Sequence, residues 1–311
     1  MAIKRRGTYE AVVDNTVSKH TFGVKKIQQL AKYHELPDWM KDNHFILGSY
    51  VSETSSFKAC FRSLTYLHNE TANIYTHLVP ALVFPTLASF FAFILFQQNA
   101  FEQTFNHSAV AVDYVVCSLF LFGLFGCFMF SACFHCFKSH SHKIAIVGNK
   151  LDYLGIVLLI STSLIGIIYY AFIDMPNLYS IMILVTVILA MVCATVSLDD
   201  DFRRPEWRPF RASMFVSFGL WGGVPVLVGL YTYGKEETMQ RCSLKFIMLE
   251  AFFYILGASI YALRVPERLA PGSFDLLGNS HQIFHVLVVI AAVCHGRALV
   301  DSYNYSKLTS V

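Results

Sequence analysis

Long apolar runs alternate with short polar segments along most of the chain. A bilayer core of about 30 Å needs roughly 20 helical residues to cross it, and we count seven runs of that length. The runs are Thr76–Gln97, Ala109–Phe134, Leu151–Ile173, Leu178–Leu198, Ala212–Tyr233, Ser243–Leu263 and Ser280–Val300. Lipid cannot satisfy unpaired backbone groups, so each run is predicted to be a helix. We therefore expect an all-α integral membrane protein with seven transmembrane helices.

Basic residues are concentrated on one side of this predicted bundle. The loops on the N-terminal side contain Lys138, Lys143, Lys150, Arg203, Arg204, Arg208, Arg211, Arg264 and Arg268. The opposite loops contain Lys235, Arg241 and Lys245. Lysine and arginine favour the cytosolic side of a membrane. The N-terminus is therefore expected in the cytosol, and seven spans place the C-terminus outside the cell or in a lumen.

The polar and apolar segments divide the chain into four parts. We expect a polar, partly disordered cytosolic region over residues 1–50 and an amphipathic helix on the cytosolic interface over 51–75. The seven-helix domain covers residues 76–300, and residues 301–311 form a short external tail. The opening stretch MAIKRRGTYEAVVDNTVSKH is polar and basic, so no cleavable signal peptide is expected.

Composition supports a membrane protein and excludes some other classes. Hydrophobic residues make up 55% of the chain and charged residues 14%. The net charge of +3 is explained by cytosolic anchors at the helix ends, so no nucleic-acid partner is expected. The eight cysteines lie mostly within the spans, which argues against a disulfide framework. These features predict a multi-pass protein of the plasma membrane or an endomembrane.

Four ionisable residues from three predicted helices lie at one depth, near the cytosolic side. His135 lies at the end of the second span, Asp152 at the start of the third, and His281 and His285 at the start of the seventh. Charged groups at such positions are costly and indicate function. Three imidazoles and one water form the open tetrahedral site of zinc hydrolases. His295 lies roughly 15 Å beyond His285 along the helix and cannot share the same ion.

Asp152 and Ser131 have alternative roles in this arrangement. Asp152 is either a direct metal ligand or a carboxylate that orients a water and takes its proton, unless it forms an ion pair with Lys150 or an arginine. We favour the water-orienting role. Ser131 lies one helical turn before His135, and its hydroxyl can bond a water, a substrate oxygen or its own helix. These two residues are the candidate catalytic groups.

Other histidines and cysteines at this level have simpler explanations. His77, His140 and His142 are rival ligands by depth, but interface anchoring or capping is favoured for all three. The stretch CFHC at 133–136 has the spacing of a metal motif, yet it has no second pair of ligands in the sequence. The candidate ligand set therefore remains His135, His281 and His285.

Three sequence blocks resemble the progestin and adipoQ receptor family, in its adiponectin-receptor-like branch related to hemolysin III, as a fungal-type member. The blocks are FRSLTYLHNETANIYTH, SACFHCFKSHSHK followed by LDYLGI, and RVPERLAPGSFDLLGNSHQIFHVLVV. The resemblance covers roughly residues 57 to 295 and agrees in spacing and order as well as residue type.

This resemblance implies a seven-helix fold with a cytosolic N-terminus. It implies zinc bound by His135, His281 and His285 with Asp152 and Ser131 nearby, while Glu70, Asn73 and His77 match the first block in a structural role. It also implies ceramidase-type hydrolysis of a ceramide-like lipid in the membrane, coupled in some members to an extracellular protein ligand.

Three functions remain open on the sequence alone. The first is a zinc-dependent lipid amidase linked to signalling. The second is a non-enzymatic receptor with structural zinc, and the third is a protein of zinc or lipid homeostasis. A transporter would need polar residues along a path, and spans four to six offer almost none. The oligomeric state is not predicted.

Overall fold

The structure is a computed structural model of the chain, and it describes residues 30–99 and 107–309. In these ranges every regular element is a helix, apart from an isolated β-bridge between Ala31 and Tyr50. The α-helices are α1 (Phe57–Ser63), α2 (Thr71–Asn99), α3 (His107–Phe137), α4 (His142–Ala171), α5 (Pro176–Ser197), α6 (Arg208–Leu220), α7 (Gly223–Arg241), α8 (Leu244–Leu263) and α9 (Ser280–Thr309).

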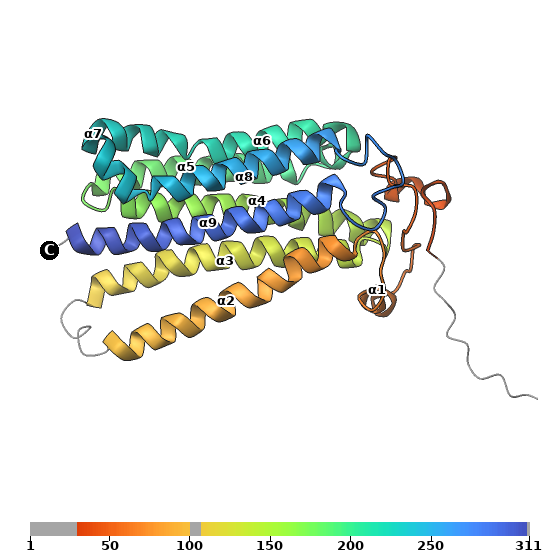
Figure 1. The fold of residues 1–311 in the computed structure, drawn as a ribbon, viewed down its shortest axis with the longest axis horizontal. Helices are drawn as coiled ribbons and strands as arrows, with labels where there is room; N and C mark the ends of the chain where they lie inside the picture. The colour runs from red at the N-terminus through yellow and green to blue at the C-terminus, as the bar shows by residue number, and fades with distance from the viewer. Residues whose placement is uncertain (1–29, 100–106, 310–311) are drawn as a thin grey trace, which may run out of the picture.

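The long helices lie side by side in one bundle, with α1 at one end and the C-terminus at the other (Figure 1). Helices α3, α4 and α9 enclose the main core, which includes Phe128, Leu159 and Ala292. The contact between α3 and α4 is close at Gly155, where an added Cβ would lie 2.9 Å from the Cα of Cys127. Small residues permit such close approach between membrane helices.

Six candidate membrane spans are present in the described part of the chain, judged by length and apolar composition. They are Ala111–Phe137, His142–Ala171, Pro176–Ser197, Pro205–Arg241, Leu244–Leu263 and Ser280–Leu308. These spans confirm that the protein is an integral, multi-pass membrane protein. The predicted total of seven spans remains a prediction, because the side chains of α2 from residue 90 onward lie outside the described set. The orientation of the termini also remains a prediction.

Three predicted segments differ from the helices in the structure. The fifth apolar run is divided between α6 and α7, which separate at Trp221 and Gly222. The interfacial segment 51–75 is helical over Phe57–Ser63, and then again from Thr71 where α2 begins. Residues 301–309 continue α9, where a tail was expected, and Lys307 forms an ion pair with Asp113 on α3.

The N-terminal segment, defined here as residues 31–50, packs beside α1 at the end of the bundle (Figure 1). Its buried side chains Leu36, Met40, Ile46 and Tyr50 form a small apolar cluster. This part of the predicted polar region is therefore folded. The expectation of disorder falls mainly on residues 1–29, which lie outside the described residues.

Candidate metal centre

The first turn of α9 is fixed by polar contacts that orient its histidines. Asn279 precedes the helix and its Oδ1 accepts a hydrogen bond from the backbone N–H of Gln282 at 3.2 Å, as an N-cap does. The Gln282 side chain donates in turn to the backbone carbonyl of Asn69 at 3.2 Å. Because His281 and His285 are four residues apart, both occupy one face of this anchored helix.

Three histidines converge at the level of this turn. The ligand atoms of His135, His281 and His285 all lie within 4.8 Å of one another. The Nε2 atoms of His135 and His281 are 3.2 Å apart. A tetrahedral zinc ion with Zn–N bonds of about 2.0–2.1 Å separates its ligand nitrogens by about 3.3–3.4 Å. The donor set and its spacing therefore fit a divalent metal ion.

Hydrogen bonds to the outer nitrogens leave two of these rings free to bind a metal through Nε2. The Nδ1 of His135 lies 2.7 Å from Oε2 of Glu70, and the Nδ1 of His285 lies 3.1 Å from the backbone carbonyl of Asn73. A carboxylate and a carbonyl only accept, so each Nδ1 carries the hydrogen and each Nε2 keeps its lone pair. Such partners fix the tautomer and orientation of metal-binding histidines.

Glu70 has a larger role than the sequence suggested. Besides His135, it receives hydrogen bonds from Asn73 at 2.7 Å and from Lys138 at 2.9 Å. Burial acts to raise the pKa of Glu70, but the charge of Lys138 and the hydrogen bonds from His135 and Lys138 outweigh it and hold that pKa well below its usual range. Glu70 is therefore ionised. No sequence pattern indicated this contact, since Glu70 and His135 are 65 residues apart.

Asp152 and Ser131 lie near the three histidines. Asp152 lines a cavity of about 270 Å³ together with His135 and His281. Ser131 is buried on α3 and is a hydrogen-bonding neighbour of the Asp152 carboxyl group. The three-histidine group of the described residues does not include Asp152. Its position across the cavity is compatible with the water-orienting role.

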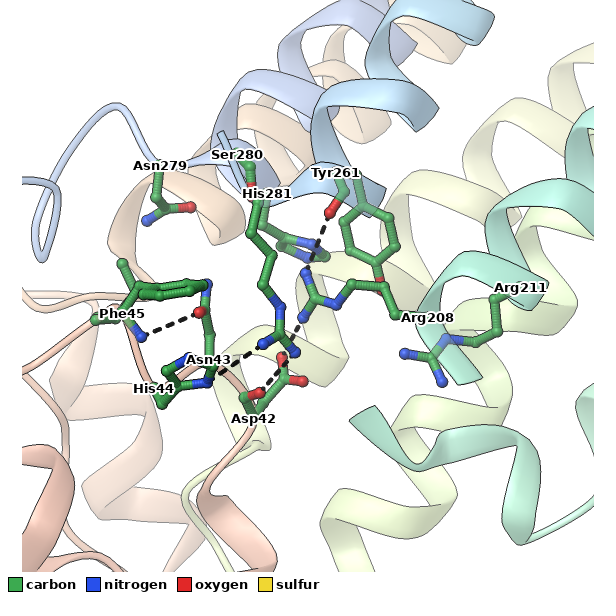
Figure 2. A network of polar contacts seen from close by, with 12 residues as sticks. Asp42, Asn43, His44, Phe45, Arg208, Arg211, Tyr261, Asn279, Ser280 and His281 are labelled. Atoms are coloured by element: carbon green, nitrogen blue, oxygen red, sulfur yellow. Dashed lines mark hydrogen bonds and ion pairs between the residues drawn. The ribbon is translucent and has the colours of Figure 1, made fainter. Parts of the chain in front are cut away.

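The alternative partner of Asp152 is engaged elsewhere. Lys150 forms its ion pair with Asp200 at 2.8 Å. The buried arginines that line the cavity also have other contacts: Arg208 pairs with Asp42 at 2.9 Å, in the network drawn in Figure 2. Arg211 donates to the backbone carbonyls of residues 202 and 204.

The rival histidines have distinct surroundings. The ring of His77 stacks on His285 with centroids 3.8 Å apart, and its two nitrogens have no hydrogen-bond partner among the described residues. The rings of His140 and His142 make tilted contacts with those of Phe57 and Trp39, respectively. These three positions are compatible with packing roles.

His295 belongs to a different polar pair. Its Nδ1 lies 2.8 Å from Oε2 of Glu250 on α8. Glu250 is therefore an ionisable residue within the predicted sixth span, which was expected to be almost without polar residues. This contact between α8 and α9 is a single hydrogen-bonded pair, however, and it does not form a path across the membrane.

Comparison with known proteins agrees with this architecture. The family model described as "Haemolysin-III related" matches residues 65–296. The chain is 46% identical over 280 residues to the "ADIPOR-like receptor IZH2" of Saccharomyces cerevisiae, covering 90% of this chain and 86% of that protein. It is 43% identical over 281 residues to the "ADIPOR-like receptor IZH1" of Eremothecium gossypii, covering 90% and 87%. It is 36% identical over 304 residues to the "Adiponectin receptor protein" of Drosophila melanogaster, covering 96% and 66%.

The fold and the buried histidines define a multi-pass helical membrane protein with a candidate metal centre at one end of its bundle. The extent of the family match identifies the group more closely. The chain belongs to the haemolysin-III-related family and has ADIPOR-like receptors among its homologues. The predicted resemblance is thereby confirmed.

Proposed function

We propose that this protein is a zinc-dependent membrane amidohydrolase that cleaves the amide bond of a ceramide-like lipid, with a link to signalling. The observation that carries the proposal is the group of His135, His281 and His285 beside a cavity that Asp152 also lines. Three neutral imidazoles with a carboxylate nearby are typical of hydrolytic zinc sites. The proposal includes seven spans, with α2 as the first, and a cytosolic N-terminus.

Zinc suits this donor set better than magnesium or calcium. Imidazole nitrogens are borderline ligands that favour zinc and late transition metals, whereas magnesium and calcium favour oxygen. His135 and His285 would bind through Nε2 because their Nδ1 atoms are engaged by Glu70 and Asn73. Zinc was the expectation from the sequence, and the three-ligand geometry supports it.

The protein residues divide the work of amide hydrolysis. A bound zinc ion would supply a more acidic water and polarise the amide carbonyl. Asp152 accepts the proton of the attacking water, whose oxygen bonds to the carbonyl carbon. The C–N bond then breaks, and Asp152 returns the proton to the departing nitrogen. Ser131 orients the Asp152 carboxylate through its hydroxyl. The products are a fatty acid and a sphingoid base.

The size of the cavity supports a substrate that enters only in part. Binding pockets for complete small molecules measure about 300–1,000 Å³. The cavity of about 270 Å³ suits the amide head group, while the chains of the lipid remain among the apolar helices.

A non-enzymatic receptor is the second candidate, and one feature favours it. The three histidines join α3 to α9, and the contact of His285 with Asn73 extends the connection to α2. A metal ion at this point would cross-link the bundle whether or not it activates water. The relatives named above carry the word receptor in their descriptions.

Hydrolysis of defined ceramides by the purified protein tests the proposal. We expect release of fatty acid that stops on metal chelation and returns with zinc. The His281→Ala variant is the matched control for contaminating activity, because it should remain inactive after zinc is returned. A protein that binds zinc stoichiometrically but never hydrolyses ceramide would favour the receptor.

A further inference from the structure

Glu267 lies at the centre of a buried polar contact next to the metal centre. It belongs to the connection between α8 and α9, and none of its surface is exposed. Its Oε2 accepts the backbone N–H of Ser280 at 2.7 Å, and its Oε1 accepts the Ser280 hydroxyl at 2.5 Å. Ser280 is the first residue of α9 and immediately precedes His281. A carboxylate at a helix N-terminus is favourable because it meets free N–H groups and the positive end of the helix dipole.

The same carboxylate contacts the N-terminal segment. The side-chain amide of Asn43 donates to Oε1 of Glu267 at 3.0 Å across 224 residues of sequence. The carbonyl oxygen of the Asn43 side chain accepts the backbone N–H of Phe45 at 3.2 Å, which fixes a local turn. The oxygen of the Asn43 side chain thus bonds within the N-terminal segment, and its amide nitrogen bonds to Glu267 next to the metal centre.

Further hydrogen bonds attach the N-terminal segment to the connection that holds Glu267. The Arg264 side chain donates a hydrogen bond to the backbone carbonyl of Asp42 at 3.1 Å. The backbone N–H of Gly272 donates to the backbone carbonyl of Phe45 at 2.9 Å. Figure 2 draws Asn43 and Phe45 of this segment in the same view as Ser280 and His281 at the start of α9. The contact therefore connects a segment distant in sequence to the first turn of α9.

We propose that Glu267 is a positioning residue, and that the hydrogen bond from Asn43 to Glu267 couples the N-terminal segment to the metal affinity of the three-histidine site. This inference rests on the proposed zinc site. With Asn43 in place, Glu267 is held where it anchors Ser280, and His281 keeps its position. Without that donor, the carboxylate has one partner fewer and the start of α9 is less restrained.

Exchange of donor and acceptor tests the coupling. Asn43→Asp keeps the oxygen that Phe45 needs but replaces the donor with a carboxylate facing Glu267. Glu267→Gln keeps the shape and one acceptor oxygen for Ser280. Each single variant should lose zinc to a chelator about 10- to 100-fold more readily, the range found for outer partners of metal ligands. The double variant restores one donor and one acceptor and should recover most of the retention.

Zinc retention and thermal stability are measured together on the purified full chain. Lys32→Ala is the control in the same segment, because Lys32 is exposed and does not line the cavity, and it should leave retention unchanged. Normal retention in Asn43→Asp, or a double variant as weak as the two singles combined, would overturn the coupling. If Glu267→Gln does not fold, zinc retention by Asn43→Asp alone still tests the coupling. Ceramide hydrolysis is not the readout, so a protein that binds zinc without hydrolysing lipid would contradict the proposed function and leave this inference standing.

Discussion

The Nδ1 of His135 and the Oε2 of Glu70 lie 2.7 Å apart, joining the end of α3 to the residue just before α2. Lys138 holds the other oxygen of the same carboxylate at 2.9 Å. A carboxylate in this position fixes the ring of a metal-binding histidine and increases its basicity. Glu70 is therefore part of the candidate metal centre although it does not face the ion.

Removal of the Glu70 carboxylate should weaken metal binding. We expect Glu70→Ala to lower zinc affinity about 10- to 100-fold, because His135 loses the partner that fixes its tautomer. Glu70→Gln should lie between wild type and Glu70→Ala, since the amide oxygen can still accept from Nδ1. Competition with a chelator measures the effect, and exposed Glu53→Ala is the control. Equal zinc affinity in all four proteins would remove Glu70 from the centre.

Loss of any of the three histidines should release zinc, whereas loss of His295 should not. The ligand variants are His135→Ala, His281→Ala and His285→Ala, and each should also lower thermal stability by removing a cross-link between helices. His295→Ala should keep full zinc, but it should be less stable because Glu250 loses its partner within the membrane. Metal analysis and thermal unfolding in detergent separate these outcomes. Zinc loss in His295→Ala would show that the ligand set is wrong.

The sequence predicted the helices and the ligand candidates better than it predicted their surroundings. Apolar length alone located the long helices, and the four-residue spacing of His281 and His285 placed both on one face. The role of Glu70 was missed because it depends on a contact across 65 residues, outside any apolar run. The contact between Asn43 and Glu267, across 224 residues, follows only from tertiary packing. The break between α6 and α7 was not predicted, because Gly222 and Gly223 lie within a continuous apolar run.

The ion pair of Asp42 with Arg208 should give stability a defined pH dependence. Burial acts to raise the pKa of Asp42, but Arg208, Lys138 and Arg264 outweigh it, so the pKa in the folded protein is lowered. A lowered carboxyl pKa stabilises the fold above the unfolded value of about 3.9, and this contribution is lost as the pH falls below it. The melting temperature of Asp42→Asn should therefore lie below that of wild type, and the difference between the two should be constant between about pH 7 and pH 5. This difference in melting temperature should become smaller below about pH 4. A difference that grows on acidification would contradict the lowered pKa of Asp42.

The proposed orientation can be tested with single cysteines at exposed positions. Asn304 lies near the end of α9, and Glu53 lies shortly before α1 at the opposite end of the bundle (Figure 1). Both residues are exposed. A membrane-impermeant thiol reagent should label Asn304→Cys in intact cells and Glu53→Cys only after permeabilisation. Wild-type protein with its eight native cysteines gives the background. The reverse pattern would invert the topology.

The rate of ceramide hydrolysis by Asp152→Asn at matched zinc content tests the central claim most directly. The substitution keeps the size of the side chain and removes the proton acceptor, so hydrolysis should fall by about 10²- to 10⁴-fold while zinc stays near one per protein. Parallel loss of zinc and stability would instead make Asp152 a direct ligand. Undiminished hydrolysis by a fully loaded, stable Asp152→Asn protein would contradict the account of Asp152 as the proton acceptor.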